Sequence, residues 1–314
     1  MRVCEIAHGV LGMNLFAGID GGQSSTVAII GDERGRVLAR GVAGPADEIG
    51  VAADSPRLHD ALLGALDDAR RAAGLAANTR FAAIVAGISG YDGRVYGRAP
   101  DLPAERLVLM HDTPIAHAGA LGGQAGIVVI AGTGSVVYAR DEKGTSATLG
   151  GWGFLFGDEG SAFAIVRDAL ALLMRAYDDG DFSYASETRA ICDFFGTTSL
   201  RRLTHAFYKG EVTRDRLAAF APVAMGFESF RGLADRGADR LATLVRTQIA
   251  AGAPARVALV GGVFADEGFR QRVRAGIQQA FPSAEVVEPR YEPAYGALLL
   301  AYRETGIGIA EIRR

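Results

Sequence analysis

One pattern occurs twice in this chain: an apolar segment, a loop of glycines and hydroxyl residues, a second apolar segment and an acidic turn. The first copy has the loop Asp20-Gly21-Gly22-Gln23-Ser24-Ser25-Thr26, and the second has Ala131-Gly132-Thr133-Gly134-Ser135. Glycine lets backbone N–H groups approach a phosphate closely, and hydroxyls add further donors. The repetition therefore predicts two similar domains that hold one nucleotide from both sides.

The first glycine loop leads into a strand and not into a helix, which excludes the Rossmann arrangement of strand, G-x-G-x-x-G and helix. Short apolar runs bounded by glycine and acidic turns indicate the strands, and apolar positions at helical spacing indicate the helices. The expected strands are 15–19, 26–30, 37–41, 81–87, 107–110, 126–130, 136–140 and 257–260. The expected helices are 55–73, 116–121, 161–177, 186–194, 213–231, 234–251 and 294–302.

This alternation predicts the α/β class and two domains. We expect an N-terminal domain over residues 1–118 and a C-terminal domain over residues 119–314, with the terminal helix packing back on the first domain. No low-complexity segment separates the two halves, so the boundary is placed on the small-residue stretch near 118–126.

Composition excludes several classes of protein. The chain has 314 residues, 49% hydrophobic and 22% charged, with a net charge of -3. Nucleic-acid and anionic-membrane surfaces need a clustered positive field, which this balance does not supply. The two cysteines, Cys4 and Cys192, have no metal-site spacing. No apolar run reaches the roughly 18 residues of a membrane span, and we find no signal peptide, so we expect a cytoplasmic protein.

The chain contains four glycine-rich motifs, and their order along the sequence is characteristic. After the two loops above, the chain contains Gly150-Gly151-Trp152-Gly153-Phe154-Leu155-Phe156-Gly157-Asp158-Glu159-Gly160-Ser161 and later Val260-Gly261-Gly262-Val263. Together they resemble the N-acetylglucosamine kinase family and the related ATPases once grouped with benzoyl-CoA reductase activators. The resemblance covers nearly the whole chain from Ile19 onward, and it implies two ribonuclease H-like (actin-like ATPase) domains flanking a nucleotide and sugar cleft.

The resemblance implies ATP and Mg²⁺ as cofactors and assigns the nucleotide contacts. Phosphate would be held by Gly21, Gly22 and Ser24 of the first loop and by Thr133 and Gly134 of the second, and the adenosine by Gly261 and Gly262. Asp20 would lie near the magnesium ion, which favours carboxylate and phosphate oxygens. Gln23 and Ser25 depart from the usual Gly and the frequent Lys of the family.

The resemblance assigns the general base to Asp112, which follows an apolar strand and His111, at the edge where open α/β sheets bind ligands. It would accept the proton of the attacking sugar hydroxyl. The alternative is that Asp112 is only the N-cap of the following helix. The remaining substrate contacts implied by the resemblance are Asp47, Ser89, Gly90, Gly151, Trp152 and Asp158, although Ser89-Gly90 could equally be a simple turn.

The expected activity is ATP-dependent phosphorylation of an amino sugar, most readily N-acetylglucosamine to its 6-phosphate, with glucosamine as the alternative. Asp47 stands where these kinases carry Asn, and a carboxylate accepts hydrogen bonds but cannot donate them, which favours glucosamine. The uninterrupted motif Gly150–Ser161 favours N-acetylglucosamine. The expected partners are ATP and a small amino sugar, with a homodimer as the assembly.

Two other classes of function stay open. An ATP-driven electron-transfer activator of the same superfamily would need cysteines to bridge a cluster, and Cys4 and Cys192 lie outside the glycine loops. A sugar-sensing repressor would need an added helix-turn-helix, for which residues 1–14 are too few.

Overall fold

The computed structural model describes residues 13–46 and 52–313. The chain forms two compact units: residues up to Gln124 together with Pro289 onward, and residues Ala125–Glu288. The sequence analysis placed the boundary after residue 118 and counted the end of the chain with the second domain. The first unit instead continues to Gln124 and takes in the C-terminal segment, because helix α10 (Pro293–Glu304) packs on its sheet.

The first unit is built on a five-stranded sheet of order β3-β2-β1-β4-β5. β1, β2 and β3 form an antiparallel meander, whereas β1, β4 and β5 run parallel. The strands are β1 (Leu15–Gly21), β2 (Thr26–Asp32), β3 (Val37–Ala43), β4 (Phe81–Ile88) and β5 (Ala104–His111). Both faces of the central strands are buried, which explains their continuous apolar runs.

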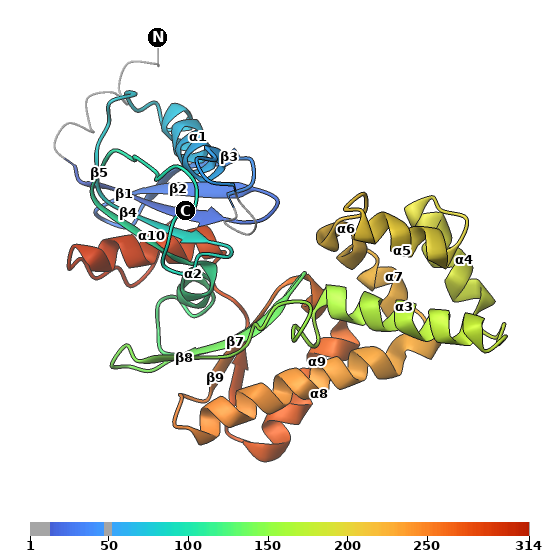
Figure 1. Cartoon of the computed structure of the whole chain (residues 1–314). Helices are drawn as coiled ribbons and strands as arrows, with labels where there is room; N and C mark the ends of the chain where they lie inside the picture. Colours follow the sequence, from blue (N-terminus) through green and yellow to red (C-terminus); the bar gives the residue numbers. More distant parts are fainter. Residues whose placement is uncertain (1–12, 47–51, 314) are drawn as a thin grey trace, which may run out of the picture. The chain divides into compact units, whose positions relative to one another are not determined.

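Helices cover both faces of this sheet (Figure 1). α1 (Arg57–Ala72) packs on one face through Leu58, Leu62 and Leu66, which recur at helical spacing. α10 covers the other face beside the short α2 (Asp112–Ala120). The first unit is therefore a three-layer structure whose second face is closed by the last helix of the chain.

The second unit repeats the sheet of the first. Its order is β10-β9-β6-β7-β8, again an antiparallel meander of three strands followed by parallel neighbours. The strands are β6 (Gly126–Ala131), β7 (Ser135–Arg140), β8 (Ser146–Gly150), β9 (Arg256–Val260) and β10 (Glu285–Val287). The duplicated pattern of the sequence thus corresponds to two α/β units of the same topology, which confirms the predicted fold class.

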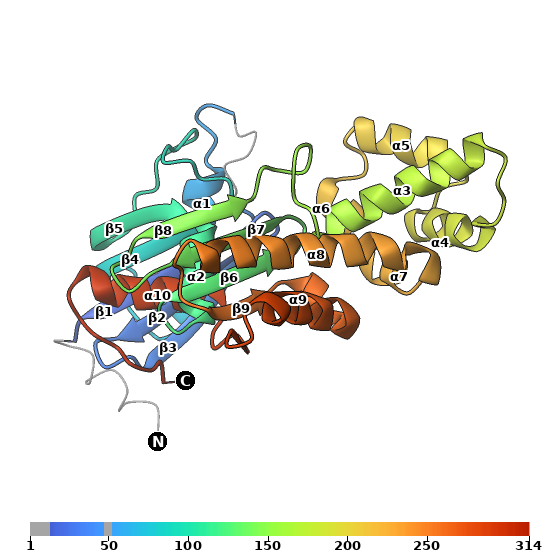
Figure 2. The same ribbon diagram turned by 90° about the horizontal axis from the view of Figure 1, so that it is seen from below.

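The helices of the second unit form two packing groups (Figure 2). The first group packs on the sheet and comprises α8 (Glu228–Ala250), α9 (Glu267–Ala280) and the 3₁₀ turn η1 (Gly262–Ala265). The second group has its own apolar core, shared with the start of α8, and comprises α3 (Ala162–Asp178), α4 (Ala185–Phe195), α5 (Leu200–Tyr208), α6 (Arg214–Ala218) and α7 (Ala221–Met225). None of the helices within residues 13–46 and 52–313 is long and apolar enough to cross a membrane.

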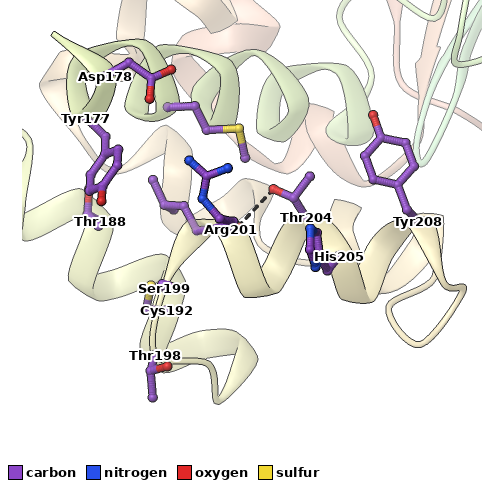
Figure 3. Close-up of a pocket in the computed structure, with 12 residues that line it drawn as sticks. Tyr177, Asp178, Thr188, Cys192, Thr198, Ser199, Arg201, Thr204, His205 and Tyr208 are labelled. Carbon is purple, nitrogen blue, oxygen red and sulfur yellow. Dashed lines mark hydrogen bonds between the residues drawn. The ribbon is translucent and has the colours of Figure 1, made fainter.

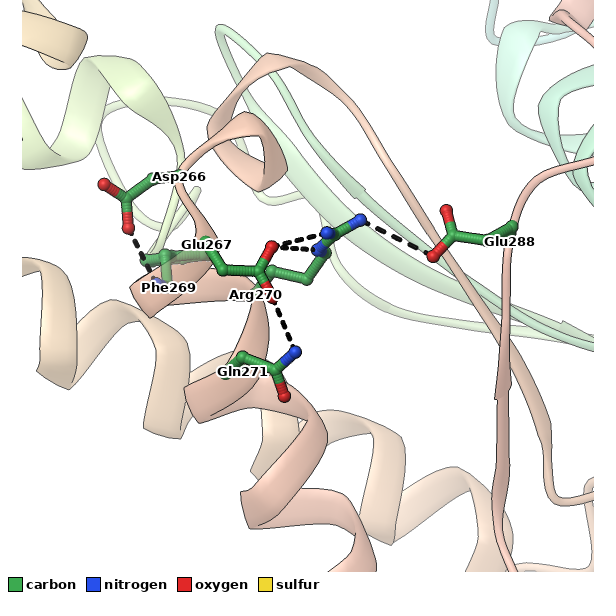
Figure 4. A network of polar contacts seen from close by, with 6 residues as sticks. All are labelled: Asp266, Glu267, Phe269, Arg270, Gln271 and Glu288. Atoms are coloured by element: carbon green, nitrogen blue, oxygen red, sulfur yellow. Dashed lines mark hydrogen bonds and ion pairs between the residues drawn. The ribbon is translucent and has the colours of Figure 1, made fainter.

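A charged network ties α9 to the end of the second unit (Figure 4). Arg270 pairs with Glu267 one turn earlier and reaches Glu288, just after β10, with 3.5 Å between Nη1 and Oε1. Gln271 donates to the other oxygen of Glu267, and the Asp266 side chain caps α9 by accepting from the Phe269 N–H at 2.8 Å. These ion pairs are exposed, so solvent screens them and they add little to stability.

All eight predicted strands are present, but several helical predictions are wrong. The helix expected over 213–231 is broken into α6, α7 and the start of α8, because Pro222 lacks an N–H and Phe227 has an extended backbone. The analysis also missed β8, β10, α5 and α9. For α9 the signal was available, since Phe269, Val273 and Ile277 recur every four residues behind a capping aspartate.

The contact between α2 and α10 predicts a stability test. A methyl group at Gly296 would lie 2.0 Å from the Ile115 carbonyl oxygen, so Gly296→Ala should separate the two helices and lower the free energy of unfolding by about 1–3 kcal/mol. Urea denaturation measures the loss, and hydrogen exchange of α2 and α10 locates it. Gly308→Ala is the control, because that position is open. Equal stability of the two variants would contradict the close packing.

Candidate functional site

Three strands of the first unit bring the predicted residues to one edge of the sheet. β1 and β4 are paired so that Asp20 lies opposite Gly87, and β4 and β5 so that Ile88 lies opposite His111. Asp20, the Ser89-Gly90 turn and Asp112 therefore lie at the ends of neighbouring parallel strands. This is the edge at which open α/β sheets bind ligands.

The first glycine loop is a tight turn held against this edge. The Gly22 N–H donates to the Ser25 carbonyl at 3.0 Å, and the Ser89 N–H donates to the Gly21 carbonyl at 2.9 Å. Ser24 is exposed. Gln23, which replaces the usual glycine, does not have a positive φ, so the turn forms without the left-handed conformation that would exclude it. The hydrogen bond from Ser89 places the predicted sugar-contacting turn beside the predicted phosphate loop.

Asp112 is the first residue of α2 and not its N-cap. The N-cap is His111, whose side chain accepts from the Thr113 N–H. The same Nδ1 atom lies 2.8 Å from the Asp112 carboxylate. Unprotonated, it accepts from Thr113; protonated, it donates to Asp112, and this second hydrogen bond raises the pKa of the imidazole above its usual value. The capping alternative for Asp112 is therefore wrong, although its half-buried carboxylate lies in the first turn of α2, where a negative charge is favourable.

The surroundings of Asp20 disfavour the charged form of its carboxyl group. Burial, followed by the nearby charges of Asp112 and Glu292, raises its pKa from 3.8 to about 7. A divalent cation nearby would favour the charged carboxylate, and carboxylate oxygens are ligands that Mg²⁺ prefers. No group of three His, Cys, Asp or Glu side chains in the described part of the chain could hold a metal by itself.

In the second unit, the second glycine loop and the 150–161 loop are hydrogen-bonded into one structure. The Ala162 N–H donates to the Gly132 carbonyl at 2.8 Å, and the Ser135 hydroxyl donates to the Glu159 carbonyl at 2.8 Å. Thr133 and Gly134 lie at the half-buried turn of this structure. Ser161 caps α3, because its side chain accepts from the Ala164 N–H.

The 150–161 loop combines exposed apolar side chains with a buried acid. Trp152, Leu155 and Phe156 are largely exposed, and Gly151 precedes them with a positive φ. Asp158 is buried and adopts a φ of 59°, which is uncommon for a residue other than glycine. The sequence analysis missed the partner of Asp158: Arg214, on α6, lies 3.2 Å from its Oδ2 atom.

The backbone of the predicted adenosine loop packs directly against the backbone of the second glycine loop. Gly261 has a φ of 115°, and a methyl group there would lie 2.2 Å from the Ala131 carbonyl oxygen. Only glycine combines this conformation with such a close approach. Gly262 begins the 3₁₀ turn that follows. Asp47, the remaining predicted site residue, lies outside the described residues.

The predicted residues therefore fall into two sets. Asp20, Gly21, Gly22, Ser24, Ser89, Gly90 and Asp112 belong to the first unit, and Thr133, Gly134, Gly151, Trp152, Asp158, Gly261 and Gly262 belong to the second. Most members of each set lie at or just after the ends of strands of their own sheet.

Comparison with known families decides the assignment. The sequence profile of the BadF/BadG/BcrA/BcrD ATPase family matches residues 17–301, which include both sheets and all four glycine motifs. The chain belongs to the BadF/BadG/BcrA/BcrD ATPase family.

Relatives of this family member include two named sugar kinases. It is 27% identical to an N-acetylmuramic acid/N-acetylglucosamine kinase of Clostridium acetobutylicum, over 63% of this chain and 68% of that protein. It is 25% identical to an N-acetyl-D-glucosamine kinase of Dictyostelium discoideum, over 91% of this chain and 97% of that protein.

A solved structure from Chromobacterium violaceum has the same fold as this ATPase family member. That protein, provisionally assigned as an N-acetylglucosamine kinase, superposes with a TM-score of 0.76 at 29% identity. The superposition covers 92% of this chain and 99% of that one. The likeness therefore extends over both α/β units and confirms the actin-like ATPase fold expected from the sequence.

The ATPase family member also has a cavity in its helical group, away from the glycine loops (Figure 3). It has a volume of about 630 Å³ and is lined by α3, α4 and α5, with Tyr177 and Asp178 on α3 and His205 and Tyr208 on α5. Arg201 extends from α5 towards α3 (Figure 3). The lining includes none of the predicted site residues.

The raised pKa of Asp20 predicts how the stability of this ATPase family member depends on pH. Between pH 3.8, where an unfolded aspartate ionises, and about 7, the folded protein retains a proton that the unfolded chain has lost. The contribution of Asp20 to the free energy of unfolding therefore falls as the pH rises through this window and is constant above it.

Asp20→Asn should remove this dependence. At about pH 8 the variant should be more stable than the wild type by roughly 1–4 kcal/mol, and near pH 4 the two should be similar. Urea denaturation of both proteins across this range measures the difference. A difference that does not vary with pH would mean that Asp20 ionises normally.

Proposed function

We propose that this ATPase family member is a sugar kinase that uses ATP to phosphorylate an amino sugar, with N-acetylglucosamine as the substrate and O6 as the acceptor. The observation that carries the proposal is the alignment of Asp20, Ser89 and Asp112 at the ends of β1, β4 and β5. A carboxylate, a hydroxyl turn and the glycine loop proposed to bind phosphate then lie at one edge of one sheet. The named activities of the Clostridium and Dictyostelium relatives support the same class of reaction.

In the proposed reaction, Asp112 accepts the proton of the sugar hydroxyl as that oxygen attacks the γ-phosphorus. Its half-buried position leaves the carboxylate accessible, and His111 can orient it by a hydrogen bond when Nδ1 carries a proton. Because phosphoryl transfer needs little covalent participation by the protein, positioning and charge neutralisation account for most of the catalysis.

The nucleotide contacts are proposed for each unit separately. In the first unit, Gly21, Gly22 and Ser24 donate to phosphate, and Asp20 lies near Mg²⁺, which neutralises charge on the phosphate oxygens when bound. In the second unit, Thr133 and Gly134 donate to phosphate, and Gly261 and Gly262 leave room for adenosine. The tight backbone turns described above support these roles, because turns of this kind present several N–H groups to an anion.

The sugar contacts proposed for the second unit are Gly151, Trp152 and Asp158, and those for the first are Asp47, Ser89 and Gly90. The exposed indole of Trp152 offers an apolar face on which a sugar ring can lie, and Asp158 can accept hydrogen bonds from hydroxyls. A cytoplasmic location and a homodimer complete the proposal. The half-buried Cys192, on α4 and far in sequence from the glycine motifs, gives no support to a cluster-bridging activator.

The catalytic role of Asp112 can be tested by Asp112→Asn. The amide keeps the shape but cannot accept the proton, so kcat should fall by about 10²–10⁴, with the affinity for ATP near normal. A coupled ADP-release assay measures kcat. Asp101→Asn, before the opposite end of β5, is the matched control and should retain full activity. Normal turnover in folded Asp112→Asn would remove Asp112 as the base.

The substrate can be tested with a panel of hexoses, hexosamines and N-acetylhexosamines. We expect the highest kcat/KM for N-acetylglucosamine, because the 150–161 motif is uninterrupted. A preference of tenfold or more for glucosamine, about 1.4 kcal/mol, would reverse this order and point to Asp47, which can accept a charge-assisted hydrogen bond from an ammonium group. Asp47→Asn should then shift the ratio towards N-acetylglucosamine.

A further inference from the structure

Both carboxylate oxygens of Asp158 have a partner inside the second unit. Oδ2 lies 3.2 Å from Nη2 of Arg214, and Oδ1 accepts from the Ser135 N–H at 3.4 Å. The ion pair is shielded from water, since only 5% of the Asp158 side chain and 23% of the Arg214 side chain are exposed. The arginine therefore fixes the carboxylate from one side and the second glycine loop fixes it from the other.

Arg214 reaches this position from a distant part of the sequence. It lies on α6, and its guanidinium carbon is 5.3 Å from the ring centre of Phe154 and 5.9 Å from that of Phe163. Phe154 belongs to the 150–161 loop and Phe163 to α3. The guanidinium of this α6 residue thus contacts both the 150–161 loop and α3. Stacking on the two rings limits its freedom to rotate.

The same guanidinium lies against the second phosphate loop. A methyl group at Gly134 would come within 2.7 Å of Nη2 of Arg214 and 3.0 Å of Oδ2 of Asp158. The absence of a side chain at this position is therefore what allows the ion pair to sit directly behind the loop.

The contact is not optimal for stability alone. The Nε atom of Arg214 is buried and has no hydrogen-bond partner among the described residues, which costs about 1–3 kcal/mol. Replacing a buried ion pair by packed apolar side chains is often neutral or stabilising. A charged pair that carries this cost and contacts a predicted phosphate loop is better explained by a role in binding.

We propose that Arg214 is a positioning residue that keeps the Asp158 carboxylate charged and aimed at a sugar hydroxyl. This inference rests on the proposed function, in which Asp158 contacts the sugar. It also assigns a role to the helical group, which supplies a residue to the site although it lies outside the duplicated sheets.

The groups around Asp158 determine how the loss of Arg214 should change the pKa of its carboxyl group. Burial raises the pKa of Asp158, while the Ser135 N–H and then Arg214 lower it; Glu159 raises it and Arg167 lowers it further. Removing Arg214 takes away the contribution of the nearest cation. The carboxylate should then become protonated at a higher pH, and the acidic limb of kcat/KM for the sugar should move to higher pH.

The test compares Arg214→Met with Arg214→Lys. We expect Arg214→Met to raise KM for N-acetylglucosamine by about 10–100-fold, the usual effect of a hydrogen bond to a charged group, with KM for ATP within about twofold. The acidic limb should shift as described, and Arg214→Lys should recover part of both effects. Fluorescence of Trp152, the single tryptophan, gives sugar affinity without turnover.

Arg216→Met is the matched control. Arg216 lies on the same helix, stacks on Phe194 at 4.7 Å and donates to its carbonyl, but it does not contact Asp158. It should leave sugar affinity and the pH profile unchanged. An Arg214→Met protein with normal sugar affinity, or one whose KM values for sugar and ATP rise together as its melting temperature falls, would overturn the positioning role.

Asp158→Asn separates this inference from the proposed function. If the wild-type protein phosphorylates no sugar, the proposed function fails, and the inference fails with it. If the wild type is active and Asp158→Asn loses sugar affinity while Arg214→Met and Arg214→Lys keep it, only the role of Arg214 is wrong.

Discussion

The parallel register of β1, β4 and β5 is the constraint on which the candidate site of the first unit depends. Because Asp20 pairs with Gly87 and Ile88 with His111, the three strands end close together. Any slip of one strand would separate Asp112 from the first glycine loop. Burial of Asp20 at this edge raises its pKa, and the nearby charges of Asp112 and Glu292 raise it further.

The second unit has the same sheet topology, but its turns pack together in a different way. Its three turns approach one another through backbone and not through long side chains, as at Gly261 against Ala131. The ion pair of Arg214 and Asp158 then supplies charge behind these turns from the helical group. The two copies of one topology therefore differ in the residues at their strand ends, with Asp20 and Asp112 in the first and Asp158 in the second.

The sequence was most informative where structure is local. Short apolar runs bounded by glycine identified the strands, and the duplicated loops identified the fold. It was least informative where contacts are distant, since nothing near residue 214 indicates a partner at Asp158. Local errors arose at helix ends, as at α2, which was expected from residue 116 but begins at Asp112 behind the cap His111.

The discontinuous first unit has a consequence for synthesis on the ribosome. Its β strands emerge early, but the face formed by Phe16, Ile29 and Val85 is covered only when Leu298 and Tyr302 of α10 have been made. The whole second unit is translated in the interval and contains all of its own elements. The first unit therefore keeps an exposed apolar face until α10 has been made. A chain truncated before α10 would keep this face exposed, and chaperones would bind it and proteases would degrade it.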